Sequence, residues 1–436
     1  MHLSKSLIWR LLALLAATTL LLGACTDSND DTNDSTDTTS GDKDLKPIKL
    51  AFVGPLTGSA ANLGINIRNG IKVALDEAKK EGLDITLEEF DTEGDPAKAP
   101  TVKDQYINDE EIVGIIGPTF SGETKAVVQA YEEAGVVMVS ASATNAALPT
   151  VVNDGASFHR IIPDDDVQGD GLAGFLATGL NAKTVAYVDD NTDYGKGLAD
   201  GTRKLMESKG VKTAVTDHVD PKSQDFSAAV NKVKAAKPDV VFYGGYYTEA
   251  GRLKKQLVDA KATATFVSGD GALDPGFIKS GGAGAEGALL TCPCNLATKD
   301  GEGGLASFAS AYEKLNTAAP GTYSTEGYDV AKLYIDLYKK GADTRKEMLA
   351  GVEGLDSFEG LSKTIEFYDN GNVKAGEVFV FEVKGGKIVL KGTAKELSKK
   401  SGTSGTSSGG SSTTSQGTTG SSTTARADST TSTTAA

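Results

Sequence analysis

The sequence predicts an α/β protein with two lobes, each built on a parallel sheet covered by helices. From residue 47 to about residue 397, short apolar runs rich in β-branched residues alternate with longer amphipathic stretches. Continuous apolar strands that alternate with helices indicate parallel sheets with both faces covered. Roughly 350 residues exceed what one hydrophobic core usually supports, so two lobes are expected rather than one.

The first strand and helix can be assigned from the residues directly. Residues 48–53 are mostly apolar and end at Gly54-Pro55, which is typical of a strand followed by a turn. In residues 66–80 the apolar side chains recur at the spacing of one helical face. The same alternation predicts later strands at residues 112–116, 136–139, 184–188, 240–243 and 265–267.

The first 24 residues have the features of a secretory signal. Two basic residues precede an apolar stretch at residues 11–22, which is too short for a comfortable membrane span. The stretch ends in Leu-Gly-Ala-Cys, and this resembles the lipobox of bacterial lipoproteins. We therefore expect cleavage before Cys25, acylation of its thiol, and an exported protein held by lipid at the outer face of the cell membrane. An ordinary signal peptide that happens to contain a cysteine is the alternative.

Two low-complexity stretches flank the folded body. Residues 25–46 comprise Cys25 and a segment rich in Asp, Thr, Ser and Asn, whereas residues 398–436 are almost entirely Ser, Thr and Gly. Neither has enough apolar residues to offset the entropy lost on ordering, so both are expected to be solvated coils. The first would act as a tether. The second could be a spacer, a glycosylated tail or simply a terminus.

The charge and the cysteines exclude several partners. The net charge is −15, which argues against binding nucleic acid and against docking on anionic lipid through a basic patch. With Cys25 assigned to the lipid, only Cys292 and Cys294 remain, and either a local disulfide or free thiols are possible. The chain has three histidines, too few and too scattered for a zinc site, and no metal or cofactor is expected.

The sequence contains no recognisable catalytic motif. No G-x-S-x-G, H-E-x-x-H or Walker A pattern is present. Residues 282–287 fit G-x-G-x-x-G, but they follow a helical stretch and precede an apolar strand, the reverse of the order that a dinucleotide site needs. The spacing of residues 164–166, all aspartate, does not match a calcium loop, and an exposed acidic turn is expected there. An enzyme is therefore not predicted.

Ligands of parallel α/β sheets bind beyond the carboxyl ends of the strands. Six loops follow the predicted strands at that end, and most are rich in Gly, Ser, Thr and Tyr. Such residues can present N–H groups, hydroxyls and phenols to a small solute, although they also make good turns. The loops are residues 54–64, 117–124, 140–145, 189–197, 244–249 and 268–273.

Motifs in these loops carry a family resemblance from about residue 48 to residue 389. In order they are Val53-Gly54-Pro55-Leu56-Thr57-Gly58, Asp95-Pro96, Ile116-Gly117-Pro118 with Ser121 and Thr124, Ser140-Ala141-Ser142-Ala143-Thr144, Asp193-Tyr194-Gly195-Lys196-Gly197, Tyr243-Gly244-Gly245-Tyr246 and Gly269-Asp270-Gly271. Their order and spacing resemble the leucine/isoleucine/valine-binding proteins of branched-chain amino-acid ABC importers. The resemblance implies the type I periplasmic-binding, or Venus-flytrap, fold of two Rossmann-like lobes joined by hinge crossovers.

The resemblance also implies a set of ligand-binding residues: Ser121, Ser142, Ala143, Thr144, Asp165, Tyr194, Tyr246 and Asp270. In the family, residues at the positions of Ser121 and Thr144 direct hydroxyls at the α-carboxylate of an amino acid, with backbone N–H groups of this region. An acid at the position of Asp270 accepts from the α-ammonium.

The remaining positions close the site. The resemblance places Tyr194 and Tyr246 on the second lobe, where they close over the ligand, and Asp165 at the lobe junction. Leu63 stands where some relatives have an aromatic residue, and Asp270 is shorter than the glutamate of some relatives. Both departures affect the pocket, so the sequence does not decide which side chain the ligand has. Gly94 and Phe120 replace a disulfide-bonded cysteine pair found in some relatives.

The function implied is capture of an amino acid, most readily a branched-chain one, for delivery to an ABC permease with separate ATPase subunits. The chain is expected to cross between lobes near Pro163, Leu290 and Gly376. Lobe 1 would comprise residues 47–163 and 290–375, and lobe 2 residues 164–289 and 376–397. The alternatives are a binder of urea, short amides or another polar solute on the same fold, and a ligand sensor for a membrane receptor.

Overall fold

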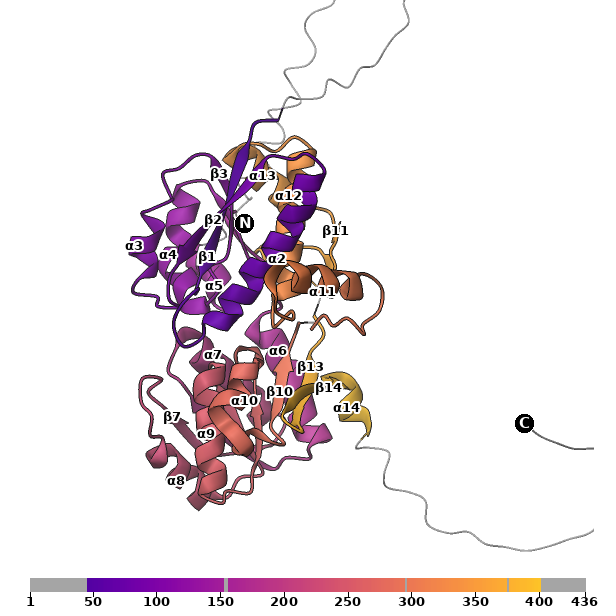
Figure 1. Ribbon diagram of the computed structural model, residues 1–436. Coiled ribbons are helices and arrows are strands. Elements are labelled where there is room, and N and C mark those ends of the chain that lie inside the picture. Colours follow the sequence, from indigo (N-terminus) through magenta and orange to yellow (C-terminus); the bar gives the residue numbers. More distant parts are fainter. Residues whose placement is uncertain (1–44, 153–155, 295, 375, 401–436) are drawn as a thin grey trace, which may run out of the picture. The chain divides into compact units, whose positions relative to one another are not determined.

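The apolar runs of the chain form two largely parallel sheets, each at the centre of one lobe (Figure 1). The structure is a computed structural model that describes residues 45–152, 156–294, 296–374 and 376–400. The predicted signal peptide, Cys25 with most of its tether, and residues 401–436 of the tail lie outside the described residues.

The first sheet has five parallel strands in the order β2-β1-β3-β4-β5. Its strands are β1 Ile48–Gly54, β2 Ile85–Asp91, β3 Ile112–Ile116, β4 Val137–Ser140 and β5 Phe158–Arg160. Successive side chains of a strand point to opposite faces. Leu50 and Phe52 of β1 therefore pack with helices at Ala61–Lys80 and Ser324–Lys339, whereas Ala51 and Val53 pack with helices at Ala99–Lys103 and Ser121–Glu133.

Helices cover both faces of this sheet (Figure 1). They are α2 Ala61–Lys80, α3 Ala99–Lys103, α4 Ser121–Glu133, α5 Leu148–Val151, α11 Gly303–Asn316, α12 Ser324–Lys339 and α13 Arg345–Glu353. The helix predicted from residue 66 begins five residues earlier. Gly64 was assigned to a loop, but it lies inside α2, where a Cβ atom would approach Pro55 O to 2.0 Å.

The second sheet has seven strands in the order β14-β13-β10-β9-β8-β6-β7. The strands from β6 to β10 are parallel, and β13 is antiparallel to both of its neighbours. Its strands are β6 Thr184–Asp189, β7 Lys212–His218, β8 Val240–Gly244, β9 Thr265–Ser268, β10 Leu289–Cys292, β13 Phe379–Lys384 and β14 Lys387–Thr393.

The helices of the second lobe again pack on opposite faces of their sheet. The helices of this lobe are α6 Asp165–Gly174, α7 Asp193–Ser208, α8 Ser227–Ala236, α9 Tyr247–Asp259, α10 Pro275–Gly281 and α14 Ala394–Lys400. Short helical turns lie at Phe175–Gly179, Asp270–Ala272 and Gly282–Ala285. A two-stranded sheet of β11 Phe358–Glu359 and β12 Thr364–Ile365 follows α13. Within the described residues, no helix combines the length and apolar character needed to cross a membrane.

The chain crosses between the lobes at three places. One crossing joins β5 to α6, and another joins the segment after β12 to β13. The crossing predicted near Leu290 comes later, because β10 pairs with β9 and β13 and belongs to the second sheet as far as Cys292. A disulfide joins Cys292 to Cys294 at this point, with their Cα atoms 5.1 Å apart, so the question that the sequence left open is answered.

Helices α2 and α12 approach closely because glycine stands at their crossing. A Cβ atom on Gly70 would lie 2.0 Å from Ser324 O, and one on Gly327 would lie 2.5 Å from Ile67 O. Both neighbours are backbone atoms, which cannot rotate aside as a side chain can. The position of α12 against the first sheet therefore depends on these two glycines.

We expect Gly70→Ala to destabilise the protein by about 2 kcal/mol, because overpacking of a tight contact typically costs about 1–3 kcal/mol. The measurement is urea unfolding at equilibrium. Gly201→Ala is the matched control, since Gly201 is also inside a helix but its nearest neighbour is 4.0 Å from a built Cβ atom. That control should be neutral or slightly stabilising. Equal midpoints for the two variants would contradict the packing argument.

Candidate functional site

A small cavity lies between the lobes at the carboxyl ends of the strands. Its volume is about 10 Å³, room for about one water molecule. The residues that line it are Leu63, Phe120, Ser121, Ser142, Tyr194, Tyr246, Asp270, Gly271 and Tyr323. The six predicted loops supply all of these except Tyr323. Both lobes therefore line the site, and a solute larger than water would enter it only if the lobes moved apart.

A larger groove elsewhere is a poorer candidate. It runs along α2 and β2, is open to solvent and contains about 1800 Å³ of space. Several of its charged groups are already paired, as in the ion pairs of Arg68 and Lys72 with Glu89. The interlobe cavity, in contrast, is lined by buried polar groups of both lobes.

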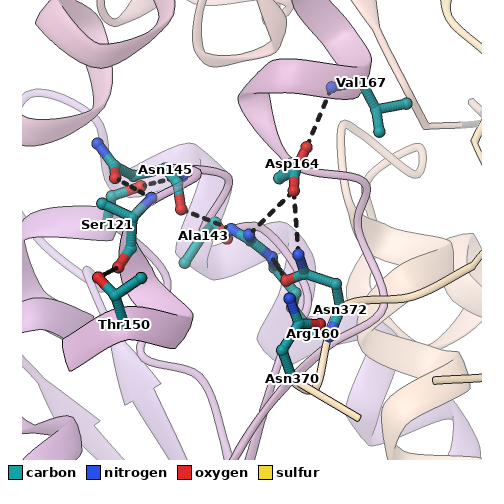
Figure 2. Close-up of polar contacts among 10 residues, drawn as sticks. Ser121, Ala143, Asn145, Thr150, Arg160, Asp164, Val167, Asn370 and Asn372 are labelled. Atoms are coloured by element: carbon teal, nitrogen blue, oxygen red, sulfur yellow. Dashed lines mark hydrogen bonds and ion pairs between the residues drawn. The ribbon is translucent and has the colours of Figure 1, made fainter. Parts of the chain in front are cut away.

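Ser121 presents a hydroxyl to the cavity from the start of α4. The residue is 1% exposed, and its Oγ accepts a hydrogen bond from the backbone N–H of Asn145 at 3.1 Å (Figure 2). Because the oxygen accepts from Asn145, the hydroxyl proton is free to be donated to a ligand. The first N–H groups of a helix have no partner within it, and the helix dipole favours an anion there. This end of the cavity is therefore suited to a carboxylate.

The loop that contains Ser142 is held in place from behind by Arg160. The guanidinium is fully buried and donates to the carbonyls of Ala143 at 3.0 Å and Asn145 at 2.8 Å (Figure 2). Burial lowers the pKa of Arg160 to about 10, while the nearby aspartates oppose the shift, so the group remains charged at neutral pH. Ser142 Oγ donates to Thr119 O at 2.6 Å, which leaves its oxygen as a possible acceptor.

Asp270 places a carboxylate on the opposite side of the cavity. The residue is 1% exposed, and Oδ1 accepts from Tyr194 Oη at 2.7 Å and from Gln168 Nε2 at 2.9 Å. Oδ2 accepts from the hydroxyl of Tyr323, which comes from the other lobe. Burial raises the pKa of Asp270, while these three donors lower it. Neutral donors reduce the cost of burying the charge without cancelling it.

Asp165 adds a second buried carboxylate at the lobe junction. It is 3% exposed, and neither oxygen makes a hydrogen bond of ordinary geometry with any described residue. Burial, and then repulsion from Asp270, raises the pKa of Asp165 well above its usual range. The hydroxyl of Thr144 and the charge of Arg160 act in the opposite direction. Two buried carboxylates so close together favour a cationic group between or beside them.

Aromatic rings form the walls of the cavity. The rings of Phe120 and Tyr246, which belong to different lobes, have centroids 4.4 Å apart, and those of Tyr194 and Tyr246 are 5.2 Å apart. The hydroxyl of Tyr194 also accepts from the backbone N–H of Gly271 at 2.9 Å. Burial raises the pKa of both tyrosines well above the usual value, so their hydroxyls stay protonated and able to donate.

The predicted site residues divide into two groups in the structure. Those that line the cavity are Ser121, Ser142, Tyr194, Tyr246 and Asp270. Ala143, Thr144 and Asp165 are buried next to it but do not line it. Thr144 is joined to the start of α6 through its carbonyl, which accepts from the N–H of Asp165 at 2.8 Å.

Sequence reasoning missed Tyr323. It precedes α12 rather than following a strand, so the rule about strand ends does not point to it. Its backbone has φ of 68°, in the left-handed region where a residue other than glycine is uncommon. This conformation directs attention to the residue only once the fold is known.

The acidic run at residues 164–166 was expected to be an exposed turn, and this was only partly right. The run starts α6, where Asp164 Oδ1 accepts from the N–H of Val167 at 3.0 Å as an N-cap. Asp166 is exposed, but Asp165 points inward and is buried. Among the described residues, no group of three or more His, Cys, Asp or Glu side chains could hold a metal ion.

A sequence profile described as periplasmic binding protein matches residues 47–387 of the chain. The chain belongs to the periplasmic binding protein family. The predicted resemblance and the two-lobed α/β fold are thereby confirmed, and the family is one of substrate-binding proteins.

Individual relatives agree with this assignment. The chain is 30% identical over 347 residues to a Leu/Ile/Val-binding protein of Rhizobium johnstonii, covering 78% of this chain and 93% of that protein. It is similar in structure to a leucine-binding protein of Thermotoga maritima, with a TM-score of 0.73 and 26% identity over 79% of this chain and 98% of that one. It is also similar to a branched-chain amino-acid transporter substrate-binding protein of Streptococcus pneumoniae, solved in complex with isoleucine. The TM-score is 0.72 and the sequence identity 25%, over 80% of this chain and 100% of that one.

We expect Asp165→Asn to stabilise the protein at pH 7 without ligand, by about 1 kcal/mol, the usual size of a single-substitution effect. Because burial raises the folded-state pKa of this carboxyl, the folded state binds more protons than the unfolded state above the ordinary value of 3.8. Its contribution to stability is therefore lost as the pH rises through the folded-state pKa. Urea unfolding at pH 4.5 and pH 7.5 measures the change.

The control for this substitution is Asp166→Asn, the exposed neighbour in the same turn of α6. It should leave the difference between the two pH values unchanged, whereas Asp165→Asn should reduce it. A pH dependence that is the same in both variants would show that the folded-state pKa of Asp165 is not raised.

Proposed function

We propose that the chain is an extracytoplasmic substrate-binding protein that captures a branched-chain amino acid between its lobes for delivery to an ABC importer. The observation that carries the proposal is the charge arrangement of the cavity. One side offers a hydroxyl and a helix N-terminus, and the other offers the buried carboxylate of Asp270. This arrangement complements a zwitterion.

The α-carboxylate is assigned to the first lobe. The hydroxyl of Ser121 would donate to it, supported by N–H groups at the start of α4 and in the loop at Ser142 and Thr144. Among the described residues, the N–H of Thr144 donates to no protein acceptor. Charge-assisted hydrogen bonds of this kind contribute about 1.5–3 kcal/mol each.

The α-ammonium is assigned to Asp270, with Asp165 close by. Asp270 already accepts three hydrogen bonds, which fix its orientation and leave room for one further donor. Asp165 is buried at the lobe junction, and a cation nearby would favour the ionised form of both carboxyls. A neutral amide such as urea would bring no such charge.

The side chain of the ligand is assigned to the apolar part of the wall. Leu63 and Phe120 of the first lobe border the cavity together with the ring of Tyr246. Several relatives are named as leucine-, isoleucine- and valine-binding proteins, which supports the same class of ligand for this chain.

Delivery follows from closure of the lobes. A ligand that contacts both lobes favours the closed arrangement by its differential affinity, and the importer would recognise that arrangement. The permease and its ATPase subunits would be separate chains. We also propose that Cys25, which lies outside the described residues, is acylated and holds the protein at the outer face of the membrane.

The ligand assignment is tested by titration calorimetry of the native protein and Asp270→Asn. Leucine, isoleucine or valine should bind the native protein, and Asp270→Asn should weaken binding roughly 10- to 100-fold, the loss expected for one charge-assisted hydrogen bond. The keto acid of leucine, which has no ammonium, should bind weakly and should be nearly indifferent to Asp270→Asn. Leucinamide has no carboxylate, so its affinity should change least on Ser121→Ala.

The control is Asp217→Asn, which removes a carboxylate from an ion pair at the surface of the second lobe. It should leave leucine affinity unchanged. Tight binding of urea or acetamide, with no binding of amino acids, would replace the proposal by the solute alternative. An equal loss for leucine and its keto acid in Asp270→Asn would refute the ammonium assignment.

The lipid anchor is tested by Cys25→Ser. In cells of a bacterium that processes lipoproteins, the native chain should incorporate labelled palmitate and sediment with membranes. Cys25→Ser should lose the label and appear in the soluble or secreted fraction, because acyl chains contribute about 0.8 kcal/mol per buried CH₂. Sedimentation of the variant with membranes would contradict lipid anchoring.

A further inference from the structure

Asn145 makes contacts in three directions from the end of the loop that borders the cavity. Its N–H donates to Ser121 Oγ at 3.1 Å, and its carbonyl accepts from Arg160 at 2.8 Å (Figure 2). Its side-chain Nδ2 donates to the carbonyl of Asp193 at 2.6 Å. Asp193 belongs to the second lobe, whereas the other two contacts lie in the first lobe and at the crossing.

The orientation of the Asn145 amide is fixed by a local hydrogen bond. Oδ1 accepts from the N–H of Ala147 at 2.9 Å, an Asx turn within the same loop. The opposite end of the amide must then be the N–H end, which is the one that faces the carbonyl of Asp193. The contact across the lobes is therefore a donor paired with an acceptor.

The partner of Asn145 in the second lobe is adjacent to the ligand cavity. Asp193 is the first residue of α7, and Tyr194, the next residue, donates to Asp270 and lines the cavity. A hydrogen bond at Asp193 thus fixes the start of α7 against the loop that orients Ser121. Asn145 is thus one hydrogen bond away from Ser121, and it is connected to Asp270 through Asp193 and Tyr194.

Arg160 connects the same loop to the crossings. Its Nε donates to Asn372 Oδ1 at 2.8 Å, and Nη2 lies 3.5 Å from Asp164, which also accepts from Asn372 at 3.0 Å (Figure 2). Asp164 in turn caps α6. The loop at Asn145 is therefore tied to two of the three chain crossings through one buried guanidinium.

A glycine in α7 makes room for Asn145. A Cβ atom built on Gly197 would lie 2.6 Å from Asn145 Nδ2, its closest neighbour. The atom in the way is the end of a side chain, so alanine at this position would push the amide aside instead of breaking the helix. The chain offers in Gly197 a way to disturb this contact from the opposite lobe.

We propose that Asn145 is a positioning residue that latches the two lobes together over the ligand and links ligand contact at Ser121 to closure. This inference rests on the proposed function, since it assigns the latch to the same cavity. Its side chain holds α7 against the first lobe. Its main chain holds Ser121 and receives the guanidinium that reaches the crossings.

The test is a double-mutant cycle of Asn145→Ala and Gly197→Ala, measured as the rate of leucine dissociation. Asn145→Ala removes the amide but keeps the N–H that orients Ser121. It should speed dissociation about tenfold, as expected for one hydrogen bond that forms on closure, with little change in the association rate. Gly197→Ala should have a similar effect in the native protein and almost none in Asn145→Ala.

Two matched controls separate the latch from general damage. Gly201→Ala is in the same helix with open space around it, and Lys125→Ala removes an exposed ion pair of 2.7 Å to the carboxylate of the same Asp193. Neither should change dissociation more than about twofold, because exposed ion pairs contribute little. A merely structural role for Asn145 would change urea unfolding but leave the dissociation rate unaltered.

Additive effects of the two substitutions, or an unchanged dissociation rate in Asn145→Ala, would overturn the latch. Small-angle scattering distinguishes this from failure of the proposed function. If the native protein binds no amino acid, the proposed function is wrong, and the latch is judged without ligand. Gly197→Ala must then give a larger radius of gyration than Gly201→Ala, and equal radii would overturn the latch independently.

Discussion

The burial of two carboxylates beside one another is the constraint on which the rest of the site depends. Asp165 and Asp270 are enclosed where the lobes meet; burial raises the pKa of each, and repulsion from Asp270 adds to the shift of Asp165. Tyrosine and glutamine donors surround Asp270, but donors without charge cannot neutralise it. A positive group beside Asp270 would therefore lower the cost of contact between the lobes.

The scaffold places this local constraint where the two lobes meet. Parallel strands bring their carboxyl ends together, so each lobe offers several loops at one edge. The loop with Ser142 is rigid because Arg160 holds its carbonyls, and the same guanidinium contacts residues at the crossings. A shift of the loop and a shift of the hinge are then parts of one rearrangement.

The sequence predicted the fold well because its signals are local and repeated. Alternating strands and helices, and the loops after the strands, placed Ser121, Tyr194, Tyr246 and Asp270 at one cavity. Tyr323 was not predictable, since its contribution depends on a packed helix and a left-handed backbone. The inward turn of Asp165 within an acidic run, and the inclusion of β10 in the second sheet, likewise depend on tertiary contacts that no local pattern encodes.

The order of strands in the second sheet has a consequence for biogenesis. Strand β13 pairs with β10 on one side and with β14 on the other, and both β13 and β14 are near the end of the described chain. Until they are synthesised, β10 is an unpaired edge, and the second lobe is incomplete. Stable folding is thus delayed until almost the whole polypeptide exists. A chain that folds so late stays unfolded during synthesis. Passage across a membrane before folding requires this unfolded state.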